Sequence, residues 1–148
     1  MKIHSNGGYV IHPPLSFTFS MVELGGASVQ KYSSIDDEYS PDRSLTPYVL
    51  KPKLEISDPE NKIPTGEYTS RLVNVKWNVT LWQNGKSLLL TEGDDTFTNA
   101  GKVGGYMLTF NRNVKLTESI HIEFSADYYN ETRKNTSQFT WEKWLNTI

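Results

Sequence analysis

Residues 73–91 read VNVKWNVTLWQNGKSLLLT, and this stretch decides the fold. Apolar and polar side chains alternate over residues 73–82, and the apolar positions are Val73, Val75, Trp77, Val79 and Leu81. A period of two places one set of side chains on one face of a β-strand, so the run predicts a strand with a single buried face. Asn84-Gly85 follows directly, and this dipeptide between two extended runs is the strongest short-range signal of a β-hairpin.

The same alternation recurs on both sides of this hairpin. Further strands are expected at residues 15–22, 49–57, 106–110, 119–129 and 137–144. All seven prolines lie in the first 64 residues, where each removes a backbone donor and opposes a helix. The chain shows no sustained apolar period of 3.6 residues, so the pattern predicts an all-β sandwich.

The first third of the chain has a different character. Residues 15–22 are expected to pair with residues 29–32, and the polar stretch 33–48 contains widely spaced prolines. Such prolines hold a chain extended, because each pushes the residue before it into β or polyproline geometry. We therefore expect residues 1–48 to form an N-terminal strand pair with an extended arm, and residues 49–148 to form the sandwich.

The order of the expected strands resembles that of an immunoglobulin-like domain over about residues 49–142. Trp77 stands where strand C of such domains carries its Trp, and Phe124 stands where strand F usually carries a Cys. Ile122 occupies the position of the Tyr that forms the tyrosine corner, so that feature is missing. The resemblance implies an immunoglobulin-like β-sandwich without its usual disulfide.

Composition narrows the class of function. The 148 residues carry 15 Lys and Arg against 17 Asp and Glu, and this balance argues against a nucleic-acid partner, which requires clustered cationic side chains. The chain has no Cys, which excludes disulfides, thiol catalysis and Cys-ligated zinc. No apolar run reaches the roughly 18 residues of a membrane helix, and no signal-peptide pattern follows Met1. We expect no membrane partner and synthesis in a cytoplasm.

Candidates for chemistry are few. His121 and Glu123 share the polar side of one expected strand and could ligate a metal, but metal sites need more converging ligands. We interpret this pair as solvated. The acidic groups at residues 36–38 and 92–95 lack the spacing of an EF-hand loop and are interpreted as solvated loops. Because no nucleophile motif such as Gly-x-Ser-x-Gly is present, we expect a protein that is not an enzyme and holds no cofactor or metal.

Aromatic side chains suggest a possible binding surface. Trp82 is out of phase with Trp77 and is expected to face outward. The candidates for an exposed aromatic platform are Trp82, Tyr128, Tyr129, Trp141 and Trp144. Aromatic faces stack on the apolar faces of sugars, so a carbohydrate-binding module that recognises a surface glycan is the alternative function. An outward Trp beside a hairpin is more often a protein contact. A small hydrolase is a third alternative, for which no motif is present.

The segment YSPDRSLTPYVLKP, residues 39–52, resembles a stretch found in tail or virion-associated structural proteins of Bacteroides-type phages and prophages. Three later features occur in the order seen in that family, namely Asp58-Pro59, Trp77 and Asn113-Val114. The resemblance implies a component of the virion that contacts other virion or tail proteins, or a second copy of itself in a homo-oligomer.

The arm itself offers a means of making such contacts. Asp42-Arg43 supplies a charge pair, and an extended arm can lie across a neighbouring subunit because it has little conformational entropy to lose. The expected function is therefore that of a non-catalytic structural or adhesion module of a phage or prophage particle.

Overall fold

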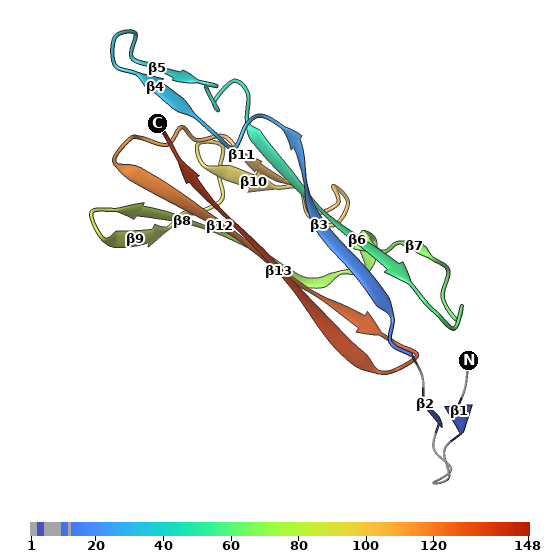
Figure 1. The fold of residues 1–148 in the computed structure, drawn as a ribbon. Helices are drawn as coiled ribbons and strands as arrows, with labels where there is room; N and C mark the ends of the chain where they lie inside the picture. The colour runs from blue at the N-terminus through green and yellow to red at the C-terminus, as the bar shows by residue number, and fades with distance from the viewer. Residues whose placement is uncertain (1–2, 5–9, 12) are drawn as a thin grey trace.

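The computed structural model describes residues 3–4, 10–11 and 13–148, which form an all-β fold of antiparallel sheets (Figure 1). The elements are β1 (Ile3–His4), β2 (Val10–Ile11), β3 (Ser16–Gly25), β4 (Lys31–Ser33), β5 (Glu38–Ser40), β6 (Tyr48–Ser57), β7 (Gly66–Glu67), the short 3-10 helix η1 (Thr69–Arg71), β8 (Val73–Gln83), β9 (Lys86–Leu89), β10 (Phe97–Asn99), β11 (Leu108–Phe110), β12 (Glu118–Asn130) and β13 (Asn135–Asn146). One large sheet has the order β13-β12-β8-β9, and the other has the order β10-β11-β6-β3, with β7 added to β6. None of these residues forms a helix with the length and apolar character needed to cross a membrane. The expected all-β architecture is confirmed.

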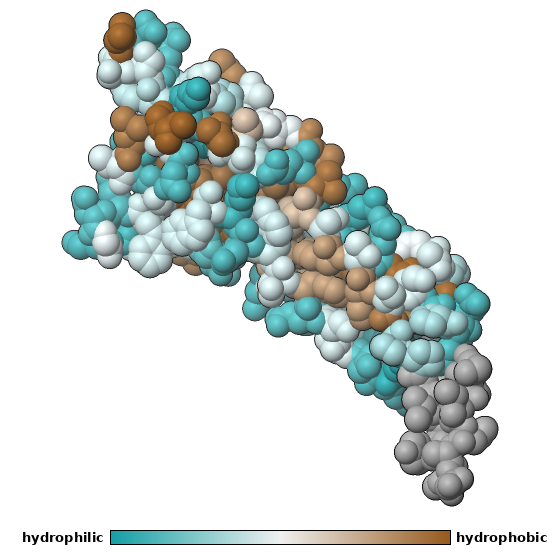
Figure 2. Space-filling model, viewed as in Figure 1, coloured by the Kyte–Doolittle hydropathy of each residue, from teal (hydrophilic) through white to brown (hydrophobic). Residues whose placement is uncertain are grey.

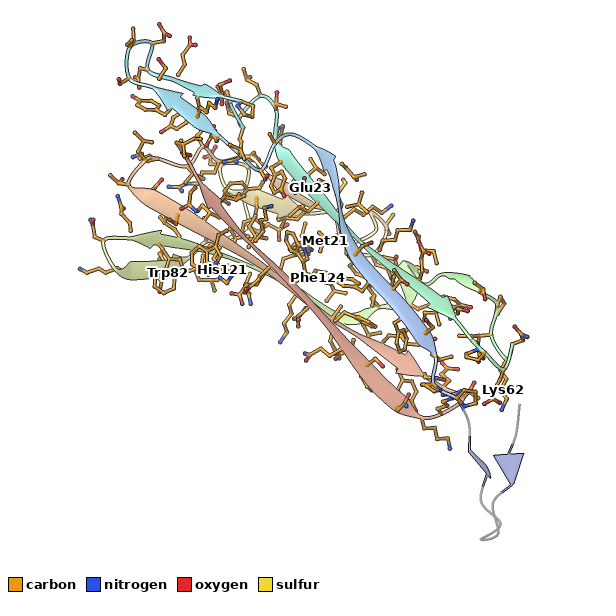
Figure 3. All side chains as sticks on the ribbon, in the orientation of Figure 1. Met21, Glu23, Lys62, Trp82, His121 and Phe124 are labelled. Atoms are coloured by element: carbon orange, nitrogen blue, oxygen red, sulfur yellow. The ribbon has the colours of Figure 1, made fainter. Side chains whose placement is uncertain are left out.

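The two large sheets pack against each other, and their inner faces form the core. Phe19 on β3 stacks on Phe124 of β12 with ring centroids 5.6 Å apart, and Trp77 of β8 meets the same ring edge-on at 4.8 Å. Figure 3 shows Met21 and Phe124 in the space between the sheets. The expected alternation of β12 is confirmed, because its buried apolar residues are Ile120, Ile122, Phe124, Ala126 and Tyr128. Removal of this apolar surface from water is the main stabilising contribution.

The hairpin expected from Asn84-Gly85 is formed by β8 and β9. Gln83 pairs with Lys86, and both turn residues have positive φ, 52° at Asn84 and 72° at Gly85. A type I′ turn needs these values at both central positions, which is why Asn-Gly is favoured there. The expected burial of Trp77 is also confirmed, since only 8% of this residue is exposed.

The apolar alternation of β8 begins two residues later than expected. Val73 is exposed and does not share the buried face with the later apolar residues of the strand. The cause is a bulge, because the pairing with β12 shifts between Ser125 and Asp127 and Asn74 adopts a φ of 53°. A bulge breaks the strict period of two, so a residue beyond it changes face.

Pro52 lies on the inner face of β6, which is a central strand of its sheet. On one side β6 pairs with β3, while on the other β11 covers residues 48–50 and β7 covers residues 55–56. Leu54 directs its N–H to Thr69 Oγ1 on that second side. Pro52, two residues earlier, turns its backbone nitrogen the same way, so its missing donor falls in the gap between β11 and β7.

The N-terminal region folds differently from the expectation. β3 pairs with β6 and not with residues 29–32, so it is part of the sandwich and the chain does not divide at residue 48. The alternating apolar face of β3 matches the apolar face of β6, which the polar stretch 29–32 does not offer. β4 pairs with β5, and this small hairpin projects from one end of the molecule (Figure 1). Some residues of the expected N-terminal region lie outside the described residues, and these are 1–2, 5–9 and 12.

Residues 41–47 do not form an extended arm, because a turn folds them back onto the sandwich. Leu45 and Thr46 both donate their backbone N–H to the carbonyl of Asp42. Arg43 is fully buried, and its guanidinium donates to Gln30 Oε1 at 3.0 Å and to two backbone carbonyls at 3.2 Å. The expectation of an extended arm is therefore wrong for these residues.

Gln30 connects this turn to the C-terminal end of the chain. Its Oε1 accepts from the backbone N–H of Val114 and from Thr147 Oγ1, and its amide nitrogen lies 2.6 Å from Asn113 Oδ1. Asn113 Oδ1 also accepts the backbone N–H of Arg43. Gln30, Arg43 and Thr147 are buried and Asn113 is half-buried. We call these four residues the buried polar cluster, which holds four separate segments of the chain together.

Asp42 belongs to the rim of this cluster. Its Oδ1 accepts hydrogen bonds from Ser44 and from the Asn113 side chain, and these bonds lower the pKa of its carboxyl group. Asp42 and Arg43 thus stabilise the turn from opposite sides. The prediction that they form a charge pair on an arm is wrong, because each is engaged within its own chain.

Candidate functional site

The outer face of the β13-β12-β8-β9 sheet, the side turned away from the core, carries the candidate site. Strand register arranges its side chains in rows that run across the sheet. In one row, His121 of β12 lies between Thr80 of β8 and Trp144 of β13. In the next row, Glu123 of β12 lies directly opposite Glu142 of β13. Three strands therefore hold these side chains at fixed positions on one rigid surface.

Two tryptophans stand together on the outer face. Trp82 and Trp144 are 40% and 46% exposed, and their ring centroids lie 6.2 Å apart with planes inclined at 50°. The His121 ring stacks on Trp144 with centroids 4.2 Å apart and planes at 13°. Figure 3 shows Trp82 and His121 near the β9 end of the sheet, and Figure 2 shows mixed pale and hydrophilic atoms over that end. We call Trp82 and Trp144 the tryptophan pair.

His121 connects the tryptophan pair to two carboxylates. Its Nε2 lies 3.0 Å from Oε2 of Glu142, and its Nδ1 lies 3.4 Å from Oε1 of Glu123. One possible ligand atom from each residue lies within 4.8 Å of the other two. The imidazole side chain is 13% exposed, whereas those of Glu123 and Glu142 are 48% and 67% exposed. We call these three residues the histidine–glutamate cluster, and the interpretation of His121 and Glu123 as a solvated pair is wrong for the histidine.

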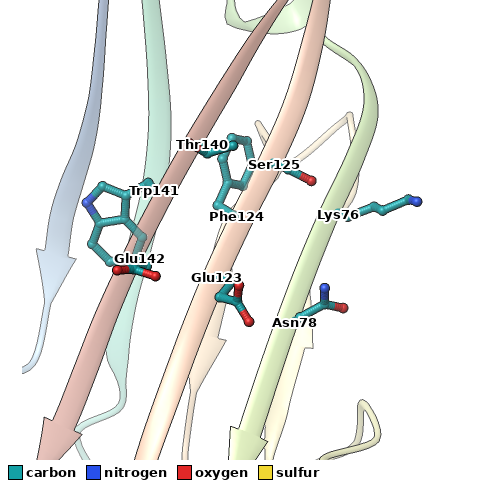
Figure 4. Close-up of a pocket in the computed structure, with 8 residues that line it drawn as sticks. All are labelled: Lys76, Asn78, Glu123, Phe124, Ser125, Thr140, Trp141 and Glu142. Atoms are coloured by element: carbon teal, nitrogen blue, oxygen red, sulfur yellow. The ribbon is translucent and has the colours of Figure 1, made fainter.

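A shallow groove of about 570 Å³ continues from this cluster across the three strands. Its lining residues are Lys76, Asn78, Glu123, Phe124, Ser125, Thr140, Trp141 and Glu142. In Figure 4 the carboxylates of Glu123 and Glu142 lie on adjacent strands, and Lys76 and Asn78 extend from the next strand. The groove thus offers a cation, an amide and two carboxylates, which can donate and accept hydrogen bonds.

The exposure predicted for the aromatic candidates is confirmed for the tryptophan pair and wrong for two other residues. Tyr128 lies on the inner face of β12 and is 7% exposed. Trp141 is half-buried and packs against the core. Successive side chains of a strand point to opposite faces, and both of these residues have the phase of the buried set. Tyr129 is exposed, but it lies at the far end of β12 from Trp82.

The remaining predicted residues lie away from the outer face. Asp42 and Arg43 belong to the turn described above. In the acidic loops, Asp37 accepts a hydrogen bond from the Tyr32 hydroxyl, and Glu92 accepts one from the backbone N–H of Asn99. Within the described ranges, neither loop gathers three possible metal ligands.

Sequence reasoning missed Glu142 as a neighbour of His121. The signal in the chain was the phase of residues 137–146, which places Glu142 and Trp144 together on the polar side of the last strand. The pairing of that strand with β12 has no local signal, because it depends on the length of the turn between them. Of the two carboxylates beside His121, the sequence therefore predicted Glu123, which is on the same strand, but not Glu142.

Comparison with protein-family models, with curated proteins and with solved structures gives no match. The geometry of the outer face is the basis for a functional proposal.

Proposed function

We propose that this chain is a non-catalytic structural or adhesion module of a phage or prophage particle, made in the bacterial cytoplasm and assembled into the virion. It acts through protein–protein contacts with other virion or tail proteins or with a second copy of itself. The observation that carries the proposal is the exposed tryptophan pair on the outer face. Trp is among the residues that contribute most binding energy at protein interfaces, and a rigid sheet presents it at low entropic cost.

Strand order supports an immunoglobulin-like sandwich for this module. The sheet β3-β6-β11-β10 has the order A-B-E-D, and the sheet β13-β12-β8-β9 has the order G-F-C-C′. Trp77 on β8 packs against Phe124 on β12, where immunoglobulin domains pack their Trp against a disulfide. The absence of Cys and the Ile at position 122 are departures from that family.

The assignment to a phage particle rests on the resemblance of residues 39–52. These residues include Arg43 of the buried polar cluster, so the resemblance concerns a segment that the fold uses. The genes on either side of the coding sequence test the assignment. Capsid or tail genes there would support it, whereas a metabolic operon without particle genes would contradict it.

Glycan binding is a second candidate function. The observation that favours it is the angle of 50° between Trp82 and Trp144, which forms a shallow aromatic corner. The carboxylates and the Asn78 amide that border the adjacent groove can bind sugar hydroxyls. Aromatic stacking combined with such polar groups is the chemistry that a sugar ring requires.

Size-exclusion chromatography with light scattering, run over a range of concentrations, tests the first function. We expect a defined oligomer for the wild-type chain and a monomer for the double variant Trp82→Ala/Trp144→Ala. Tyr129→Ala is the matched control, because Tyr129 is as exposed as Trp144 but lies at the other end of the sheet. An oligomer that survives in the double variant would contradict a role of the outer face in self-association.

A glycan array on the same three proteins tests the second function. Binding that is lost in the double variant and kept in Tyr129→Ala would support a carbohydrate-binding module. Binding that is equal in all three proteins would contradict it. The two measurements together separate the candidates, because the first detects a protein partner and the second a sugar.

A further inference from the structure

We propose that the histidine–glutamate cluster is a binding site for a divalent transition-metal ion, for which Zn²⁺ is the probe. The ligands are one imidazole nitrogen of His121 and one carboxylate oxygen from each of Glu123 and Glu142. This site goes beyond the proposed contact function, because it needs neither a partner protein nor a glycan. It also revises the expectation, drawn from sequence, that the chain holds no metal.

The donor set selects the class of ion. Ca²⁺ and Mg²⁺ prefer sites made only of oxygen ligands, whereas imidazole suits Zn²⁺ and neighbouring transition metals. Zn²⁺ commonly takes three protein ligands and leaves a further position to water. One nitrogen and two carboxylate oxygens on an open face fit that arrangement.

The fold buries most of the histidine side chain and leaves the two carboxylates exposed. His121 is mostly buried because its ring stacks on Trp144, and both residues are in paired strands. Zinc bonds of about 2.0–2.2 Å require ligand atoms roughly 3.4 Å apart, somewhat closer than the present limit of 4.8 Å. The exposed side chains of Glu123 and Glu142 can close this difference by rotation, without any movement of the backbone.

The charge of the site favours a cation. Glu123 and Glu142 are directly opposite each other across two strands, an arrangement in which like charges repel. In the part of the chain that the structure describes, the ion-pair partner of both carboxylates is His121. A divalent ion between them would replace this repulsion by two attractive contacts.

Without an ion, His121 lies between the two carboxylates, with its Nε2 3.0 Å from Oε2 of Glu142 and its Nδ1 3.4 Å from Oε1 of Glu123. Titration of Zn²⁺ into the full-length chain at pH 7.5, followed by calorimetry, distinguishes the two arrangements. We expect saturable binding of one ion per chain, weakened at least ~10-fold in Glu142→Gln and in His121→Ala. Asp127→Asn is the matched control, because Asp127 is a carboxylate of the same strand that hydrogen-bonds Asn74, and binding there should stay within about twofold of wild type.

Two results would overturn the proposal. The first is the absence of saturable binding to the wild-type chain. The second is binding that persists unchanged in Glu142→Gln and His121→Ala, which would place the ion on other residues. Glu142→Gln decides the matter if His121→Ala fails to fold, because Glu142 is the most exposed member of the cluster. Long-range ¹H–¹⁵N spectra should show the zinc-induced shift at a ring nitrogen of His121 and not at His4 or His12.

Discussion

β8 carries one tryptophan on each face of the same sheet, and the two residues differ in every contact. Trp77 lies in the core, packs on Phe124 and donates its Nε1–H to the carbonyl of Tyr106 at 2.9 Å. Trp82 lies on the outer face, and its ring contact is with Trp144, which is itself exposed. The comparison teaches that the inner residue stabilises the fold, whereas the outer residue adds little to stability and is available for binding.

Trp77→Ala should produce the largest loss of stability. The change removes a large buried ring and its hydrogen bond, so we expect the free energy of unfolding to fall by about 3–5 kcal/mol. Trp82→Ala on the same strand should cost less than about 1 kcal/mol, because half-exposed side chains contribute little. Urea denaturation followed by circular dichroism measures both values. Equal losses in the two variants would break the distinction between the faces.

Arg43→Met tests whether the buried polar cluster contributes to the stability of the fold, as the inner face of the sheet does. Met retains much of the side-chain volume but removes the Arg43 donors to two backbone carbonyls and one of the three donors to Gln30 Oε1. We expect a loss of about 2–4 kcal/mol, since each buried polar group left unpaired is costly. Arg71→Met is the control, because Arg71 is exposed, and it should change stability by less than about 0.5 kcal/mol. A similarly small effect at Arg43 would mean that residues 41–47 can leave the sandwich as the arm first expected.

The strands were predictable where the signal is local. The alternation in β8 and β12 and the Asn84-Gly85 turn need only neighbouring residues, and these predictions were correct except at Val73, where the bulge changes the phase of β8. Arg43 was not predictable in the same way, because its burial depends on Gln30, Ala27 and Ser28 and on a long-range bond to Asn113. An Arg between Asp42 and Ser44 in a polar, proline-containing stretch is locally typical of an exposed loop residue.

The same distinction between local and long-range signals applies to the residues of the candidate site. The outward phase of Trp82 followed from its own strand, whereas its neighbour Trp144 was one of several candidates until the strand pairing selected it. The prediction that Tyr128 and Trp141 are exposed was wrong, because residue type was given more weight than strand phase. Residue type indicates what a side chain can bind, but only phase and register decide whether it is accessible.

Acid should weaken the fold through buried carboxylates. Burial raises the pKa of Asp58, but backbone N–H bonds from Glu60, Lys62 and Ile63 outweigh it and lower the pKa below its usual value. Because its pKa is lowered, the Asp58 carboxylate stabilises the folded state. This stabilisation is complete above the unfolded pKa of about 3.9 and is lost as the pH falls through the folded pKa. Asp58→Asn should cost about 1–2 kcal/mol at pH 7, because the new amide nitrogen cannot accept two of these bonds.

Denaturation of Asp58→Asn at pH 7 and at pH 2 checks this assignment. The difference from wild type should shrink towards acid pH, because the stability that the Asp58 carboxylate contributes is lost as the pH falls through its lowered pKa. A difference that is constant with pH would show that shape, and not the charge of this carboxylate, is what the turn requires. The stability that Glu118 contributes should also be lost in acid. Burial raises the pKa of its carboxyl group, but hydrogen bonds from Lys115 N–H and Arg112 outweigh this effect and lower the pKa.

Glu123→Gln should have the smallest effect on stability and gives the sharpest test of the outer face. The change removes an exposed ion pair with His121, but it also relieves the repulsion of the opposing Glu142. Because the two contributions have opposite sign and both are small at an exposed site, we expect a net change within about 0.5 kcal/mol in the absence of metal. Denaturation in the presence of a chelator measures this value, and the same experiment with added Zn²⁺ should stabilise the wild type more than the variant. A loss in chelator as large as that of Arg43→Met would make the histidine–glutamate cluster a structural element like the buried polar cluster, because a group kept for binding should be dispensable to the fold that presents it.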